Sequence, residues 1–203
     1  MGVSDARLNR GRPRRAVGGG ASGYAICSFF PEFAMVNHNF FCDEYEVAPN
    51  VHSRYAAAQR LIRPSEVRHL IRIVPRGLLP ILQPAAAVVA NVLTRRFRTR
   101  ELRYIKDPPG RDVWRSPAAT FRRGGGDCED LAIIGMSIFE LVGIPAVLVI
   151  GQLPTGGHAW VEGQDEAGRF MLEATDGSVT RVVRPAQYRA EQFIGRDFCQ
   201  LAA

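Results

Sequence analysis

The segment from Asp127 to Pro145 constrains the fold more than any other part of this chain. Apolar residues recur through it at helical spacing and also fill its other sides: Leu131, Ile133, Ile134, Met136, Ile138, Phe139 and Leu141. A helix that is apolar almost all round has to be buried, so other elements must surround it. Asp127 is a suitable N-cap residue, and Gly143 and Pro145 mark the end of the helix.

Three strand-like runs follow this helix. Residues 146–151 are continuously apolar, as in a central strand, whereas residues 158–162 and 169–176 alternate between apolar and polar side chains. The intervening residues 163–168, GQDEAG, have the composition of a hairpin turn. The sequence therefore predicts that the last two runs pair as an antiparallel hairpin.

The upstream half of the chain divides into a tail, an extension and further helices. Residues 1–22 are rich in arginine and glycine and are predicted to be disordered. Residues 23–75 are predicted to pack as an N-terminal extension on a domain formed by residues 76–203. We expect one helix over residues 65–74 with Ser65 as its N-cap. We expect a second over residues 84–98, with Pro84 at the first helical position.

The charge of the chain bears on its partners. The net charge of +6 comes almost entirely from arginine, because Lys106 is the single lysine. The basic tail could contact nucleic acid, but a solvated tail has better support, because no aromatic residues alternate with its arginines. No stretch reaches the ~18 apolar residues of a membrane span, so we expect no membrane partner.

The four cysteines indicate the compartment and argue against a metal. No CxxC pair is present, so we expect neither a metal site nor a cofactor. A chain of 203 residues does not need disulfides to fold, and we interpret Cys27, Cys42 and Cys199 as structural thiols in a cytoplasmic protein. Export is the alternative, because Arg14 and Arg15 resemble part of a twin-arginine leader, although no A-x-A cleavage site follows.

Cys128 lies at the first turn of the predicted buried helix. Unpaired N–H groups and the helix dipole stabilise a thiolate there, and the thiolate is the nucleophilic form of cysteine. Three carboxylates flank the cysteine and oppose this effect: Asp127, Glu129 and Asp130. We expect Asp127 to cap the helix. We expect the other two to turn away from the sulfur, toward arginines such as Arg122 and Arg123.

A cysteine nucleophile needs a base, and the base needs an acceptor that orients it. His158 begins one strand of the predicted hairpin, and Asp176 ends the other. If the midpoint of the hairpin lies near Ala167, these two residues are directly opposite and on the same face. A slip of one residue would send them to opposite faces, so the prediction depends on the register.

Three motifs in this order resemble one family: GGDCED, GHAWVE and LEATDG. With the lead-in YIKDPPGRDVWRSPAATFRRGGGDCED, they resemble the transglutaminase-like cysteine peptidase superfamily, and its bacterial branch in particular. The resemblance covers about residues 84–180. It implies a papain-like α+β fold for residues 76–203, in which the cysteine-bearing buried helix packs on an antiparallel sheet. Residues 1–60 match nothing in this family, and no calcium-site signature is seen.

The resemblance implies that Cys128 is the nucleophile, His158 the general base and acid, and Asp176 the orienting residue. The implied function is a thiol hydrolase that cleaves an amide bond in a protein or peptide through a thioester. Two alternatives remain open: a glutamine transamidase or deamidase with the same triad, and a non-catalytic protein-binding module. Trp114 is a candidate second oxyanion donor. Trp160 could shield the imidazolium or be an ordinary core residue.

Overall fold

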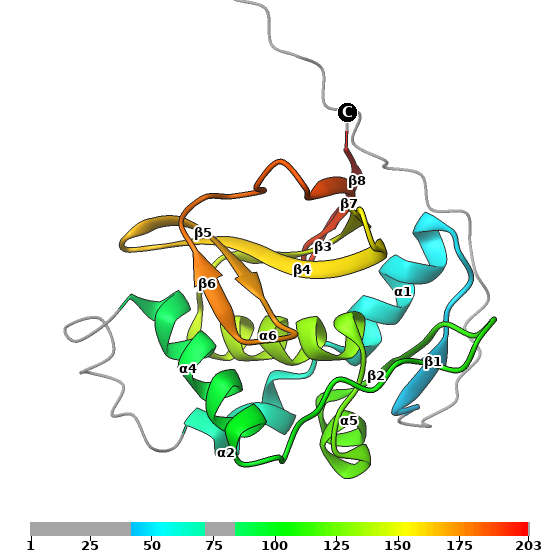
Figure 1. Ribbon diagram of the computed structural model, residues 1–203, viewed down its shortest axis with the longest axis horizontal. Coiled ribbons are helices and arrows are strands. Elements are labelled where there is room, and N and C mark those ends of the chain that lie inside the picture. The colour runs from blue at the N-terminus through cyan, green and yellow to red at the C-terminus, as the bar shows by residue number, and fades with distance from the viewer. Residues whose placement is uncertain (1–41, 72–83, 203) are drawn as a thin grey trace, which may run out of the picture.

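The computed structural model describes residues 42–71 and 84–202. The predictions for the tail at residues 1–22, for Cys27 and for the end of the helix near residue 74 lie outside these ranges. Figure 1 shows a sheet lying over one long helix, α6, with shorter helices on the other side of that helix. This arrangement confirms the predicted α+β fold with a cysteine-bearing helix packed on an antiparallel sheet.

Six antiparallel strands form the main sheet in the order β6-β5-β4-β3-β7-β8. Their bounds are β3 Ala146–Leu153, β4 Gly156–Asp165, β5 Gly168–Glu173, β6 Ser178–Thr180, β7 Arg189–Ile194 and β8 Cys199–Leu201. The predicted strand at residues 169–176 therefore ends three residues early, at Glu173. A second, smaller sheet pairs β1, Glu44–Glu46, with β2, Val113–Arg115.

The long helix α6, Cys128–Val142, is buried along its first three turns, as its apolar sides predict. One side of α6 packs on β3 and β4, which lie above it in Figure 1. Its other side packs on shorter helices, including η1 and α5. Gly143 ends it in the left-handed conformation, with φ 77°, which glycine adopts without steric cost. The helix holds its first residue, Cys128, close to the backbone of Ala159 in β4.

The remaining helices are α1 Val51–Leu61, the 3-10 helix η1 Pro64–Val67, α2 Arg68–Ile71, α4 Ala85–Arg98 and α5 Pro117–Arg123. The second predicted helix is confirmed to within one residue, because Pro84 is the N-cap of α4 rather than its first residue. The prediction that Ser65 caps a helix is wrong, since η1 already includes it and begins at Pro64. Proline with its fixed φ suits that first position.

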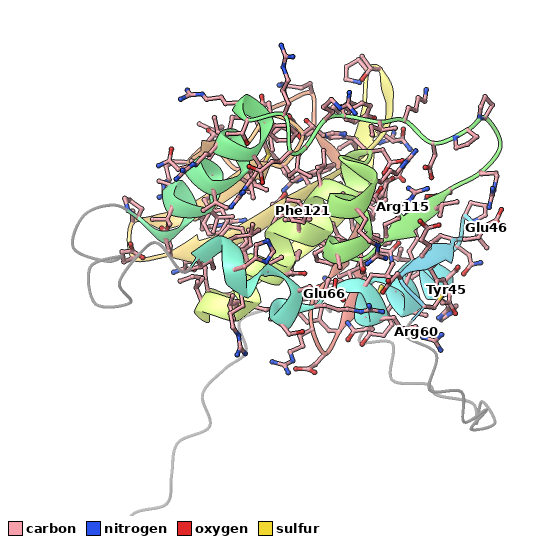
Figure 2. The ribbon with its side chains drawn as sticks, turned by 90° about the horizontal axis from the view of Figure 1, so that it is seen from below. Tyr45, Glu46, Arg60, Glu66, Arg115 and Phe121 are labelled. Carbon is pink, nitrogen blue, oxygen red and sulfur yellow. The ribbon has the colours of Figure 1, made fainter. Side chains whose placement is uncertain are left out.

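Residues 42–71 join the same core as the rest of the chain. Figure 2 shows Arg60 of α1 beside Tyr45 of β1, and Arg60 Nη1 donates to the Tyr45 hydroxyl at 3.1 Å. Glu66 of η1 accepts a hydrogen bond of 2.8 Å from the Ala118 N–H of α5. Leu61 and Val67 are fully buried in the core that surrounds α6. These contacts hold β1, α1 and η1 on the core around α6.

The turn between β4 and β5 sets which residues meet across the hairpin. Asp165 is opposite Gly168 and Val161 is opposite Leu172, so the turn contains two residues, at positions 166 and 167. The midpoint lies between those residues and not on Ala167. The predicted register is therefore wrong by one position, and His158 is not opposite Asp176.

No helix within the described ranges is long and apolar enough to cross a membrane.

Candidate active site

Cys128 is buried at the start of α6, with 6% of its surface exposed. Its thiol donates a hydrogen bond of 3.1 Å to Glu129 Oε2. The backbone N–H of Ala159 in β4 also reaches the sulfur. The structure thus brings Cys128 against the strand residue that directly follows His158, the predicted base.

The carboxylates around Cys128 oppose its ionisation. Burial raises the pKa of the Cys128 thiol, Glu129 raises it further, and the hydrogen bond from Ala159 acts in the opposite direction. Burial and the charge of Asp127 raise the pKa of Glu129 in turn. The expectation that Glu129 turns away from the sulfur is therefore wrong. The resting sulfur is a protonated thiol, and a base must remove its proton.

Asp127 precedes α6 at the N-cap position, but its side chain makes no capping hydrogen bond. Its Oδ1 atom is buried and has no hydrogen-bond partner among the described residues. Burial, followed by the nearby carboxylate of Asp107, raises the pKa of Asp127. The prediction that Asp127 caps the helix through its side chain is wrong, and this carboxylate adds to the negative potential near the sulfur.

His158 finds its acceptor in Glu173. Its Nε2 atom lies 2.7 Å from Glu173 Oε2, and both side chains are nearly buried, with 12% and 10% exposed. The same Oε2 accepts a hydrogen bond of 3.0 Å from the Tyr188 hydroxyl. The other oxygen, Oε1, accepts from both the N–H and the hydroxyl of Thr175 at 3.1 and 2.6 Å. The carboxylate is thus held by four donors.

These donors keep Glu173 ionised. Burial acts to raise the pKa of Glu173, but the hydrogen bonds from His158 and Thr175 outweigh it, so this pKa lies below its ordinary value. An ionised carboxylate can only accept, so Nε2 of His158 carries the proton of that hydrogen bond. The free lone pair of the neutral imidazole is then on Nδ1, which is the nitrogen available to a thiol.

The prediction that Asp176 orients His158 is wrong. Asp176 is exposed, and its Oδ1 accepts a hydrogen bond of 2.7 Å from the Ser178 N–H within the turn after β5. Continuing the β4–β5 register would set Glu173 opposite Trp160, two residues from His158 and on the same face. Such diagonal neighbours are within reach of a long side chain. Glutamate, one methylene longer than aspartate, spans that distance.

Two aromatic rings lie beside the imidazole of His158. Trp160 stacks beside His158 with 6.1 Å between ring centroids, and Tyr188 lies 6.1 Å from the same ring. Trp160 is fully buried and donates from Nε1 to Glu162 Oε1 at 3.0 Å. Trp160 therefore belongs to the core and also limits the movement of the histidine.

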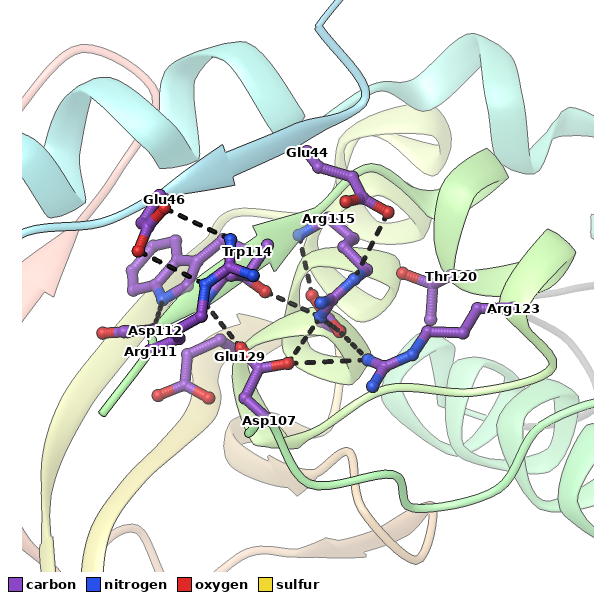
Figure 3. Close-up of polar contacts among 12 residues, drawn as sticks. Glu44, Glu46, Asp107, Arg111, Asp112, Trp114, Arg115, Thr120, Arg123 and Glu129 are labelled. Carbon is purple, nitrogen blue, oxygen red and sulfur yellow. Dashed lines mark hydrogen bonds and ion pairs between the residues drawn. The ribbon is translucent and has the colours of Figure 1, made fainter. Parts of the chain in front are cut away.

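A buried ion network fixes the first turn of α6 (Figure 3). Arg115 Nη1 lies 2.9 Å from Asp130 Oδ2 and 2.9 Å from Asp107 Oδ1. The Arg115 N–H also donates to Asp130 Oδ1 at 2.7 Å. Arg123 lies 3.9 Å from Asp130, so that carboxylate does turn toward an expected arginine. Arg115 provides the shorter contacts to the Asp130 carboxylate, and no pattern in the sequence indicated this role for it.

Trp114 is not available as an oxyanion donor. Its side chain is 1% exposed, and its Nε1 donates to Asp112 Oδ1 at 2.7 Å. Tyr104, which sequence reasoning missed, lies closer to the chemistry, because its hydroxyl reaches the Cys128 sulfur. The only sequence signal for it was its place in the lead-in to the cysteine motif.

No group of three histidine, cysteine, aspartate or glutamate side chains in residues 42–71 and 84–202 is arranged to hold a metal ion. Cys42, Cys128 and Cys199, the cysteines in those ranges, form no disulfide. What the arrangement offers is a thiol at a helix start, an imidazole held by an ionised carboxylate on the neighbouring strand, and a hydroxyl over the sulfur. These are the parts that acyl transfer through a thioester requires.

Comparisons with known proteins bear on the family and the fold of the chain. Residues 81–172 match the family model described as the transglutaminase-like superfamily. No curated protein sequence matches the chain. Two solved structures of LapG from Legionella pneumophila are similar to it, each at 18% sequence identity. The EGTA-treated form gives a TM-score of 0.50 and covers 77% of this chain and 80% of that one. The calcium-bound form gives 0.49, with 76% and 82% covered. At this identity the similarity concerns the fold alone.

Proposed function

We propose that the protein is a thiol hydrolase of the transglutaminase-like superfamily that cleaves an amide bond in a protein or peptide, and the match of residues 81–172 to that family model supports the proposal. The observation that carries the proposal is the hydrogen bond of 2.7 Å between His158 Nε2 and Glu173 Oε2, next to the strand residue that contacts Cys128. In the proposed triad, Cys128 is the nucleophile, His158 the base and acid, and Glu173 the orienting residue.

The reaction proceeds in two steps. His158 Nδ1 takes the thiol proton while the Cys128 sulfur forms a bond to the amide carbon, and the carbonyl electron pair moves to oxygen. When the intermediate collapses, the C–N bond breaks and the protonated Nδ1 gives its proton to the leaving amine. Water then attacks the thioester with the same histidine as base, the C–S bond breaks, and the thiol takes back a proton.

Glu173 supports both steps without giving up its charge. It keeps the Nε2–H tautomer of His158 in place before the reaction, and it stabilises the imidazolium that forms when Nδ1 takes a proton. Because four donors hold the carboxylate, it does not need to reorient between the steps.

Acetylation by p-nitrophenyl acetate tests the nucleophile and the base without a known substrate. We expect the acetyl group to accumulate on Cys128 faster than on the exposed Cys42, as measured by mass spectrometry of peptides from the full chain. The variant His158→Ala should slow acetylation of Cys128 roughly 100-fold or more, the usual contribution of a general base. If Cys128 reacts at the same rate with and without His158, the proposed mechanism is wrong.

Two matched variants test whether Glu173 or Asp176 is the residue that orients His158. Glu173→Gln keeps the size of the side chain but removes the charge that fixes the tautomer, so acetylation of Cys128 should fall at least about tenfold. Asp176→Asn should leave the rate within about twofold, because asparagine can still accept the hydrogen bond from Ser178. The reverse ranking of these two variants would reinstate Asp176 as the orienting residue.

The acceptor of the acyl group decides between hydrolysis and transamidation. A digest of mixed proteins, incubated with the enzyme with and without a primary amine such as glycine methyl ester, separates the two. New peptide termini in both samples support a hydrolase. Glutamine side chains that carry the amine would instead support the transamidase alternative. If neither new termini nor modified glutamines form although Cys128 accepts the acetyl group, the proposal that the protein cleaves peptide amides is wrong.

A further inference from the structure

The segment that carries Tyr104 is fixed against the glycines before Cys128. Tyr104 and Gly126 form a parallel bridge between two otherwise irregular segments. The Ile105 N–H donates to Gly126 O at 2.8 Å, and the Gly126 N–H donates to Arg103 O at 3.2 Å. The backbone of Tyr104 is therefore held beside a residue that precedes the nucleophile by only two positions.

Glycine is required for this close approach. A Cβ atom on Gly125 would lie 2.0 Å from the Arg103 carbonyl oxygen, and Gly125 has φ 145°. Any larger residue would push the two segments apart. The sequence GGG at residues 124–126 thus has a physical consequence: it brings the side chain of Tyr104 to the start of α6.

The Tyr104 side chain is partly exposed to solvent beside Cys128. It is 53% exposed, and its hydroxyl is within hydrogen-bonding reach of the Cys128 sulfur. Burial of part of the side chain, followed by the charges of Cys128, Asp127 and Glu129, raises the pKa of Tyr104 to about 12. The hydroxyl therefore keeps its proton throughout the neutral pH range and can act as a hydrogen-bond donor.

The proposed acyl transfer needs donors for the oxyanion. One is available in the backbone N–H of Cys128, because the first N–H groups of a helix have no partner within it. The second is still to be identified, since the indole of Trp114 already donates to Asp112. Tyr104 has a protonated hydroxyl close to the sulfur that attacks the carbonyl carbon, so the oxyanion that develops on that carbonyl lies within its neighbourhood.

Resting on the proposed thiol-hydrolase function, we propose that Tyr104 is a further catalytic residue, whose hydroxyl donates a hydrogen bond to the oxyanion of the tetrahedral intermediate. In the resting protein the hydroxyl faces the sulfur. When the S–C bond forms and the carbonyl electron pair moves to oxygen, the hydroxyl shifts its hydrogen bond from sulfur to that oxygen. The proton stays on Tyr104, which stabilises the charge and exchanges no proton with the substrate.

Two reactions of Cys128 distinguish a residue that stabilises the oxyanion from a residue that activates the thiol. Acetylation by p-nitrophenyl acetate passes through a tetrahedral oxyanion, whereas alkylation by iodoacetamide displaces iodide at a saturated carbon and forms none. In the variant Tyr104→Phe we expect acetylation of Cys128 to fall about 100-fold or more, the usual cost of losing an oxyanion donor. Alkylation should change by less than about tenfold, because it depends only on the availability of the thiolate.

The controls distinguish failure of this inference from failure of the triad. Tyr45→Phe removes a hydroxyl that accepts a hydrogen bond from Arg60, and both rates should stay at the wild-type values. His158→Ala should slow both reactions, since it acts on the thiol itself. If Tyr104→Phe lowers acetylation and alkylation by the same factor, or lowers neither, Tyr104 does not bind the oxyanion. That result would leave the triad intact as long as His158→Ala still slows both reactions.

Discussion

Glu129 controls how easily Cys128 loses its proton. Its carboxylate accepts the hydrogen bond of the thiol at 3.1 Å, so the neutral thiol is favoured and the thiolate is repelled. The same carboxylate is itself hard to ionise, because burial and the charge of Asp127 raise its pKa. The start of α6 therefore combines a helix dipole that favours a thiolate with a neighbouring charge that opposes it.

The variant Glu129→Gln should make Cys128 more reactive. Removing the negative charge lowers the pKa of the thiol, and each unit of that shift gives about tenfold more thiolate at a fixed pH. Burial and the charge of Asp127 raise the pKa of Glu129 to about 8, so we expect alkylation by iodoacetamide at pH 9, where this carboxylate is ionised in the wild type, to be about tenfold faster in the variant. The measurement is made in EGTA, so that no divalent cation neutralises the carboxylates.

The pH dependence provides an internal check on this prediction. Because the pKa of Glu129 is raised, the carboxylate becomes charged only as the pH rises past the ordinary range of glutamate. The gain from Glu129→Gln should therefore be small in acid, where both side chains are neutral, and should grow as Glu129 of the wild type ionises. Glu140→Gln, at the far end of the same helix, is the matched control and should leave the rate unchanged. A gain that is equal at all pH values would show that charge is not its cause.

At the scale of elements, the long helix was predictable and the hairpin partner of His158 was not. The bounds of α6 follow from local features that act within a few residues, namely an extended residue before Cys128, an apolar body and Gly143 at its end. The partner of His158 depends on whether the turn contains two or three residues. The composition GQDEAG allows both, and the difference moves every opposed pair by one position.

Side-chain length was the second obstacle to predicting the site. Directly opposed residues are the simplest choice for a hydrogen-bonded pair, and this favoured Asp176 for a hairpin centred on Ala167. The structure uses a diagonal pair, in which the glutamate side chain of Glu173 reaches His158. The contact of Glu129 was also predicted wrongly. The rotamer of its side chain decides whether the carboxylate meets an arginine or the Cys128 sulfur, and the sequence does not specify that rotamer.

The contact between the glycine segment and the Tyr104 segment gives a prediction at this scale. Gly125→Ala places a methyl group where only 2.0 Å separate it from the Arg103 oxygen, so one of the two backbones must move. We expect a loss of roughly 1–3 kcal/mol in the free energy of unfolding, as for other strained backbone positions. Acetylation of Cys128 should fall as well, because Tyr104 moves away from the sulfur.

Gly110→Ala is the matched control for this substitution. Gly110 also has a left-handed φ, of 79°, but a Cβ atom there would have no neighbour within 4 Å. It should therefore show the conformational cost alone, near 1 kcal/mol, with no change in acetylation. Equal losses of stability and activity in the two variants would mean that the close approach of the segments has no role.

At the scale of the whole molecule, a buried ion network joins parts of the chain that are far apart in sequence. Arg115 of β2 contacts Asp130 of α6 and Asp107 of the preceding loop, and it lies 3.5 Å from Glu44 of β1. The Asp130 side chain is completely buried, and those of Arg115 and Asp107 are 7% exposed. The network therefore couples the N-terminal extension to the helix that carries the nucleophile.

Arg115→Met tests the strength of this coupling. It leaves the carboxylates of Asp130 and Asp107 buried without their main cation, and breaking a buried pair from one side costs about 3–5 kcal/mol. Arg111→Met is the matched control, because the Arg111–Glu46 pair is 55% and 63% exposed (Figure 3), and such surface pairs contribute less than about 1 kcal/mol. Urea unfolding at pH 7 measures both.

The loss in Arg115→Met should also depend on pH, in a direction that identifies its cause. Without the guanidinium, burial raises the pKa of Asp130 further above its value in the unfolded chain. A carboxyl with a raised pKa in the folded state destabilises the fold as the pH rises, and it costs nothing once it is protonated in both states. Burial raises the pKa of Asp130 to about 7 in the wild type, so the difference in stability between Arg115→Met and the wild type should shrink as the pH falls from about 9 toward 6. A difference that stays constant over that range would indicate lost packing of the arginine side chain instead of unpaired charge.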